Sequence, residues 1–172
     1  ASERAWSMAR DGRHWRRVVP SPAPRQVLEA GSVRTLLDAG AVVVCTGGGG
    51  VPVRAWPDGT HEGVEAVVDK DLASAVLARQ IGADLLVILT DVPGVVVGYG
   101  TPEARLLDAV TPAGLRDLGL PAGSMGPKAE AAASFVEATS GRAVIGSLGQ
   151  AEDLVAGRAG TQVRLGPGPA LS

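Results

Sequence analysis

The chain is poor in cysteine, aromatic residues and lysine. It contains one cysteine and five aromatic residues among 172 positions. A single cysteine excludes a disulfide within the chain and is typical of proteins of the reducing cytoplasm, the location we expect. We predict that this residue, Cys45, is a small buried apolar side chain. With so few aromatic residues, aliphatic side chains and alanine must fill the core.

Long apolar runs are also missing. The longest, residues 41–45 and 85–89, have about five residues each, far short of the ~20 that span a bilayer as a helix. The composition is 45% apolar and 20% charged with a net charge of −2, which is ordinary for a globular protein. It gives no reason to expect nucleic acid or a membrane as partner. The length suits one domain with a substantial core.

Helix and strand patterns alternate after a short N-terminal region. Residues 1–19 predict a β-hairpin with its turn at Asp11-Gly12, and residues 20–24 an extended connector rich in proline. Beyond them, alternating helices and strands favour an α/β sandwich with parallel strand pairing. We predict helices at residues 26–39, 71–81, 112–118, 126–139 and 151–156, and strands at residues 41–45, 85–89, 95–99, 143–146 and 161–165.

Four consecutive glycines follow the first of these strands. Gly47, Gly48, Gly49 and Gly50 would let backbone N–H groups converge on an anion with no Cβ in the way. The next residues, Val51 and Pro52, exclude a Walker A loop, which would continue with Gly-Lys and Ser or Thr. The alternative is a flexible linker without a binding role.

Only two of the sixteen basic residues are lysines. Lys70 lies between Asp69 and Asp71, and Lys128 falls in the first turn of a predicted helix. Asp71 could simply be the N-cap of its helix. A cation at a helix N-terminus is locally unfavourable, because that end carries partial positive charge, and becomes sensible if an anion lies beside it. The two lysines therefore predict a phosphate site.

The strand at residues 85–89 ends in Thr90, Asp91 and Val92. Ligands of open α/β sheets bind beyond the carboxyl ends of the strands, although the same residue types also make ordinary turns. His14 and His61 have no neighbours that would complete a metal site, so we predict that both are surface residues and that no side chains form a metal site.

Four motifs carry a family resemblance. They are Arg16-Arg17-Val18-Val19-Pro20-Ser21-Pro22, Gly47-Gly48-Gly49-Gly50-Val51-Pro52-Val53, Asp69-Lys70-Asp71-Leu72-Ala73-Ser74 and Gly123-Ser124-Met125-Gly126-Pro127-Lys128. In this order they resemble carbamate kinases, of the amino acid kinase superfamily. The resemblance implies a three-layer αβα sandwich with a mainly parallel sheet. It also implies reversible phosphoryl transfer between ATP and carbamate, giving ADP and carbamoyl phosphate, with Mg²⁺ held mainly through the nucleotide phosphates.

The resemblance also assigns roles to residues. Lys70 and Lys128 would neutralise the transferring phosphoryl group, Asp71 would orient the lysines, and Asp69 would support the site. The four glycines would face the phosphoryl or carbamate end. The residues expected to line the nucleotide site are Thr90, Asp91, Val92, Tyr99, Met125 and Gly126.

One departure from the family is large. The family's opening strand and the first part of its protruding subdomain have no counterpart here, so residues 1–19 would be the end of that subdomain and residues 20–172 the nucleotide-binding part. We expect a homodimer and catalysis only in the complete protein, with this part inactive alone. Two alternatives stay open: a nucleotide-binding module without transfer activity, and a sister kinase that acts on another small acid.

Overall fold

The computed structural model describes residues 6–166. Residues 1–5, at the start of the predicted region 1–19, and residues 167–172, at the end of the predicted region 20–172, lie outside the described residues. The centre of the fold is a four-stranded sheet in the order β5-β9-β10-β8. The β5–β9 and β10–β8 pairs are parallel and β9–β10 is antiparallel, so the predicted, mainly parallel sheet is confirmed. Its strands are β5 (Leu85–Thr90), β8 (Ala109–Val110), β9 (Arg142–Ser147) and β10 (Thr161–Val163).

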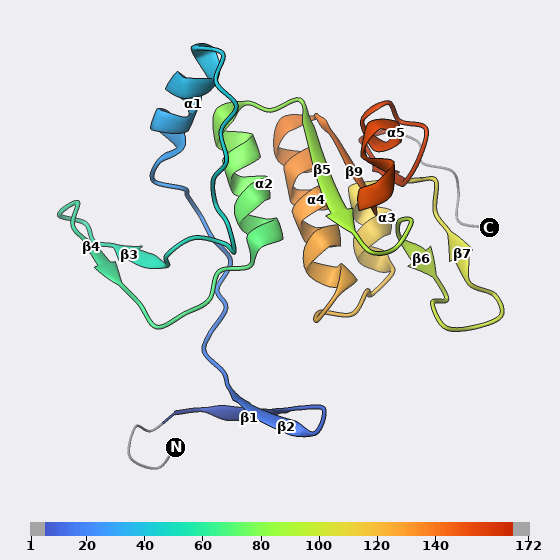
Figure 1. Ribbon diagram of the computed structural model, residues 1–172, viewed down its shortest axis with the longest axis horizontal. Coiled ribbons are helices and arrows are strands. Elements are labelled where there is room, and N and C mark those ends of the chain that lie inside the picture. The colour runs from blue at the N-terminus through green and yellow to red at the C-terminus, as the bar shows by residue number, and fades with distance from the viewer. Residues whose placement is uncertain (1–5, 167–172) are drawn as a thin grey trace.

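Helices cover both faces of this sheet (Figure 1). On one face lie α2 (Lys70–Ile81) and α4 (Met125–Thr139), with α3 (Pro112–Asp117) beside α4. On the other face, Leu154 of α5 (Ala151–Val155) packs so closely over Gly146 that a Cβ there would lie 2.4 Å from it. Side chains alternate along a strand, so the neighbouring Ile145 points into the core beneath α4. The three layers predicted from the resemblance are present.

Alanine and aliphatic side chains fill the main core, as the composition predicted. Ala131, Ala132 and Ala133 of α4 are fully buried, which lets this helix approach the sheet closely. Phe135, the only phenylalanine, is buried beside them. Within the described residues no helix is both long and apolar enough to cross a bilayer.

Most predicted element boundaries hold to within a few residues. Thr111 caps α3 by accepting a hydrogen bond from the N–H of Gly114 at 3.2 Å, and Gly82 ends α2 in the left-handed conformation (φ 73°). The helix predicted at residues 26–39 is shorter, α1 (Ala30–Asp38). The side chain of Gln80 explains this difference, because it bonds both the N–H and the C=O of Val27 and holds that residue outside the helix.

The strand predicted at residues 41–45 is wrong. This segment is irregular, and the side chains of Val42 and Val44 are 95% and 96% exposed. Cys45, predicted to be buried, is an exposed free thiol. A strand exists only through hydrogen bonds to a neighbour. Within residues 6–166 no strand pairs with this segment, so its apolar character alone does not make it one.

In the part of the chain that the structure describes, three antiparallel hairpins lie outside the main sheet. The predicted N-terminal hairpin is confirmed as β1 (Met8–Asp11) and β2 (His14–Arg17), with Gly12 in its turn at φ 58°. The pair β3 (Val53–Ala55) and β4 (His61–Gly63) was not predicted. Of the strand predicted at residues 95–99, only β6 (Val96–Val97) forms, and it pairs with β7 (Arg105–Leu106). A short 3₁₀ turn, η1 (Leu148–Gln150), precedes α5.

Candidate functional site

A cavity of about 520 Å³ lies where β5 ends and where α2 and α4 begin. Figure 1 shows the first turns of both helices and the tip of β5 at the same end of the molecule. The β6–β7 hairpin and the loop between α3 and α4 complete the wall. The lining residues are Asp69, Lys70, Asp71, Thr90, Asp91, Val92, Gly94, Val96, Tyr99, Leu120, Pro121, Ala122, Gly123, Ser124, Met125, Pro127 and Lys128.

The first turn of α2 places three charged side chains on this wall. Asp69 is the N-cap, and its Oδ1 accepts hydrogen bonds from the N–H groups of Asp71 and Leu72 at 2.8 and 3.0 Å. The alternative that Asp71 caps this helix is therefore wrong, because Asp71 lies inside the first turn. Since Asp69 holds the backbone, Asp71 is free to point at α4.

Both lysines of the chain contact one oxygen atom of Asp71. Lys128 Nζ lies 2.8 Å from Asp71 Oδ2, and Lys70 Nζ lies 3.7 Å from the same atom. The side chains of Lys128 and Asp71 are only 14% and 13% exposed, whereas that of Lys70 is 58% exposed. The sequence expectation that the two ammonium groups lie together at this edge of the sheet is thus met. The alternative is that Lys128 has only a structural role, as the partner of Asp71 in an ion pair that joins α4 to α2.

The start of α4 shows why Lys128 can occupy a helix N-terminus. No acidic residue lies in its first turn, and the Ser124 side chain makes no capping hydrogen bond. The partial positive charge of the helix end is therefore not offset from within α4. Asp71 supplies the nearest negative charge from α2, and any anion in the cavity would add to it.

The carboxyl end of β5 and the hairpin after it form the opposite wall. Thr90 ends the strand, and its hydroxyl donates to Asp91 Oδ1 at 3.1 Å. Tyr99 lies in the β6–β7 turn with 77% of its surface exposed, so its ring can cover an occupant of the cavity. Of the residues expected at the nucleotide, Thr90, Asp91, Val92, Tyr99 and Met125 all line this cavity.

The charged groups of the lining nearly balance. Three carboxylates (Asp69, Asp71 and Asp91) and two ammonium groups face the cavity, which gives it a formal charge of −1. In the described part of the chain no group of three or more side chains is arranged to hold a metal ion. His14 and His61 are exposed and lie outside the cavity lining, in agreement with the sequence prediction that both are surface residues.

The four glycines lie beside this site without lining the cavity. Gly49 has a φ of 128°, and a Cβ on it would come within 2.1 Å of the carbonyl oxygen of Val68. The loop therefore packs on the backbone immediately before Asp69. Gly47, Gly48 and Gly50 have open space around them.

Gly126 supports the cavity wall from behind. Its N–H donates to the carbonyl oxygen of Pro121 at 2.9 Å, and a Cβ would lie 2.8 Å from that oxygen. Only glycine lets the loop before α4 approach so closely. The sequence motif of Lys128 included Gly123 and Ser124 of this loop, but sequence reasoning assigned the loop no role in the site. The lining residues it did not name as site residues are Gly94, Val96, Leu120, Pro121, Ala122, Gly123, Ser124 and Pro127.

The chain is similar to several known proteins. The chain is 46% identical over 163 residues to a carbamate kinase of Haemophilus influenzae, covering 95% of this chain and 53% of that protein. It is 48% identical over 160 residues to a carbamate kinase of Escherichia coli K12, covering 93% and 52%. The structure of the carbamate kinase of Giardia lamblia bound to AMP-PNP has a TM-score of 0.86 at 39% identity, covering 95% of this chain and 53% of that one.

The chain thus spans about half the length of the curated relatives it matches. The sequence profile that describes the amino acid kinase family matches residues 4–147, which is most of the chain. This chain belongs to the amino acid kinase family.

Proposed function

We propose that this chain forms the nucleotide- and phosphoryl-binding part of a carbamate kinase. In the forward direction, an oxygen of carbamate would attack the γ-phosphorus of ATP while the bond to the β,γ-bridging oxygen breaks, giving carbamoyl phosphate and ADP. One observation carries the proposal. The only two lysines of the chain meet at one carboxylate oxygen on the wall of a cavity, at the carboxyl edge of the sheet.

The chemistry requires positive charge that is already in place. In phosphoryl transfer, negative charge spreads over the three equatorial oxygens of the moving group, and catalysis consists mainly of positioning and charge stabilisation. Lys128 is nearly buried and forms a short ion pair with Asp71, whereas Lys70 is exposed and has a longer contact with Asp71. We assign Lys128 to a fixed position beside the phosphoryl group, and Lys70 to following that group as it moves. Asp71 orients both lysines, and Asp69 supports the site by capping α2.

The remaining lining residues suit a nucleotide. The apolar part of the wall, with Val92, Val96, Leu120 and Met125, would receive the base, and Tyr99 would cover it from the hairpin. The similarity to the carbamate kinase of Giardia lamblia, whose structure holds the ATP analogue AMP-PNP, supports nucleotide binding by this chain. We assign Thr90, Asp91 and the backbone around Gly126 to this binding region as well.

The near-balanced charge of the lining supports binding of the nucleotide together with Mg²⁺. A bare triphosphate would meet three carboxylates with only two ammonium groups to offset them. Mg²⁺ in nucleotide sites is commonly bound through phosphates with one or two carboxylates. Mg²⁺, held mainly through the nucleotide phosphates, would offset part of their negative charge, and the carboxylate of Asp91 at the end of β5 would assist in holding it.

The four glycines complete the proposed site on the acceptor side. Their loop lies on the backbone just before Asp69, next to the start of α2, and three of them have open space around them. We assign this loop to the carbamate or phosphoryl end of the substrates. The specificity for carbamate and the assembly into a homodimer, both expected from the resemblance, would belong to a protein of the relatives' full length.

Two measurements test the proposal. Titration calorimetry of this chain with Mg·ADP should show binding, and the Lys128→Met variant should bind clearly more weakly. A full-length form that contains this chain should form ATP from ADP and carbamoyl phosphate. Absence of Mg·ADP binding in the correctly folded chain would overturn the nucleotide assignment.

The same assay separates the alternatives. A binding module would bind Mg·ADP but form no ATP even in the full-length form. A sister kinase would form ATP only from another acyl phosphate, such as acetyl phosphate. ATP formation from carbamoyl phosphate that exceeds the rate with acetyl phosphate would support the carbamate assignment.

A further inference from the structure

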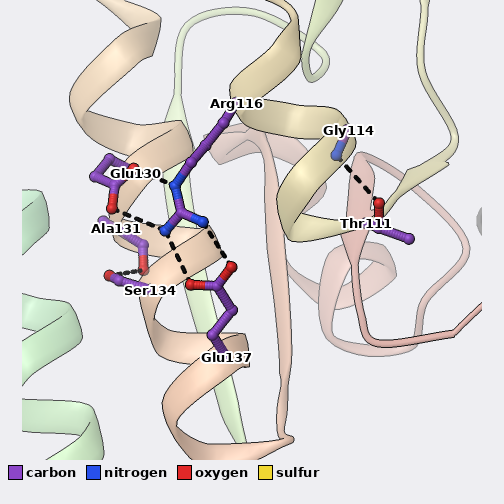
Figure 2. A network of polar contacts seen from close by, with 7 residues as sticks. All are labelled: Thr111, Gly114, Arg116, Glu130, Ala131, Ser134 and Glu137. Carbon is purple, nitrogen blue, oxygen red and sulfur yellow. Dashed lines mark hydrogen bonds and ion pairs between the residues drawn. The ribbon is translucent and has the colours of Figure 1, made fainter.

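Arg116, near the end of α3, lies between two carboxylates of α4 (Figure 2). Its Nε and Nη2 donate to Glu130 at 2.8 and 3.0 Å. Its Nη1 and Nη2 donate to Glu137 at 2.6 and 3.0 Å. Glu130 and Glu137 are seven residues, or about two helical turns, apart and therefore share one face of α4, so a single guanidinium joins positions two turns apart.

These hydrogen bonds connect two residues that flank a chain segment lining the cavity. The chain between Arg116 and Glu130 forms the loop with Leu120, Pro121, Ala122, Gly123 and Ser124, and then the first turn of α4 with Lys128. All of these residues line the cavity. The clamp formed by Arg116, Glu130 and Glu137 therefore joins the two ends of the segment that forms this wall.

Inside the segment, one carbonyl oxygen organises the turn. Pro121 O accepts hydrogen bonds from the N–H groups of Ser124 at 3.2 Å and Gly126 at 2.9 Å. Leu118, Leu120 and Met125 pack, partly buried, on the main core. These contacts shape the turn, whereas the clamp sets the position of α3 against α4.

We propose that Arg116 is a positioning residue of the nucleotide site. By holding α3 against α4, it fixes the wall at residues 120–124 relative to Lys128, so that both contact the nucleotide together. The inference rests on the proposed function, because it assumes that this cavity holds the nucleotide.

The alternative is an ordinary surface ion pair, which contributes little to stability. The side chains of Arg116, Glu130 and Glu137 are 39%, 47% and 44% exposed. Because such exposed pairs change the overall stability little, the test must measure a change at the cavity wall itself. Arg158 offers a matched control. Its Nε and Nη2 donate to Asp153 Oδ1 at 2.9 and 2.7 Å, and neither residue lines the cavity.

The experiment compares the wild-type chain with Arg116→Met and Arg158→Met by amide hydrogen exchange and by titration with Mg·ADP. In Arg116→Met, the amides of Ser124 and Gly126 should exchange faster, and Mg·ADP should bind about fivefold more weakly, which corresponds to the ~1 kcal/mol of a well-formed exposed pair. Arg158→Met should change neither quantity. The double variant Glu130→Gln/Glu137→Gln should reproduce the effect, and adding Arg116→Met to it should cause no further loss.

Each outcome decides between the readings. Unchanged exchange at residues 118–126 in Arg116→Met, or unchanged Mg·ADP affinity beside a wild type that binds, would overturn this inference alone. A folded wild type that binds no Mg·ADP would overturn the proposed function and the inference with it. If Arg116→Met does not fold, Arg116→Lys serves instead. It keeps the charge but not the planar fork, so a measurable loss smaller than that of the double variant would support the clamp, and no loss at all would overturn it.

Discussion

Lys128 and Asp71 are 57 residues apart in the chain, yet they form a nearly buried ion pair of 2.8 Å between the first turns of α4 and α2. Removing two charges from water is costly, and a pair of this kind repays the cost only when its geometry is good. The pair also places the Lys128 ammonium group on the cavity wall. It therefore has a structural consequence and a functional one, which different variants can separate.

The structural consequence can be measured with Asp71→Asn. This change leaves the Lys128 ammonium group without a charged partner at short range, so we expect the free energy of unfolding to fall by about 2–3 kcal/mol. Asp69→Asn is the matched control. It removes an equal charge two residues earlier in the chain, and asparagine still caps the helix. Urea unfolding of both variants checks this. Equal stability losses in the two would contradict the importance of the pair.

Thr161 connects the loop after β5 to the rest of the core. Its buried hydroxyl accepts from the N–H of Val95 at 2.8 Å and donates to the carbonyl of Leu107 at 2.6 Å. Thr161→Val keeps the shape but leaves both buried backbone groups unpaired, so we expect a loss of about 2–4 kcal/mol. Thr161→Ser keeps the hydroxyl and should cost about 1 kcal/mol. A valine variant as stable as the serine variant in denaturant unfolding would show that the bridge is unimportant.

The packing of the glycine loop can be tested with a neighbouring pair of substitutions. Gly49→Ala would place a Cβ within 2.1 Å of Val68 O at a φ of 128°, whereas Gly48→Ala meets open space without a positive φ. Gly49→Ala should therefore displace the loop or destabilise the chain by more than 1 kcal/mol, on the order of the cost of strained backbone. Gly48→Ala should be close to neutral. Thermal unfolding of both variants decides, and equal midpoints would contradict the observed packing.

The clamp at Arg116 predicts a pH dependence. The hydrogen bond from Arg116 lowers the pKa of Glu137 below its usual value of 4.5. A depressed carboxyl pKa gives stability that is present above the unfolded pKa and is lost as pH falls through the folded pKa. The difference in unfolding free energy between wild type and Glu137→Gln should therefore persist at pH 6, begin to decrease as pH falls below about 4.5, and be lost once pH lies below the lowered pKa of the folded state. A difference that stays constant down to pH 3 would contradict this.

The sequence predicted the helices well because their boundary signals are local. Thr111, which caps α3, and Gly82, which ends α2, act through neighbouring residues, so a single sequence contains these signals. The meeting of Lys70 and Lys128 was also predictable, since both fall where helices start at the carboxyl edge of a parallel sheet. The N-cap of α2 is Asp69 and not Asp71. The sequence could not decide between the two positions, which are two residues apart, because aspartate is favoured as an N-cap at either one.

The failures concern contacts between distant segments. Residues 41–45 have the composition of a buried strand, but a strand requires a neighbour, and composition does not say whether one is present. The predicted burial of Cys45 was wrong for the same reason, because Cys45 belongs to this segment. The clamp of Arg116 and the wall at residues 120–124 depend on how α3 lies against α4, a relation that no local pattern encodes.

The central claim is that the ammonium group of Lys128 stabilises the transferring phosphoryl group, and Lys128→Arg tests it most directly. Arginine keeps the positive charge but replaces a compact ammonium by a planar fork. In a full-length form that contains this chain, we predict that kcat for ATP formation from ADP and carbamoyl phosphate falls by about 100-fold or more, as for other charge-stabilising groups. Turnover close to that of the wild type would contradict the claim.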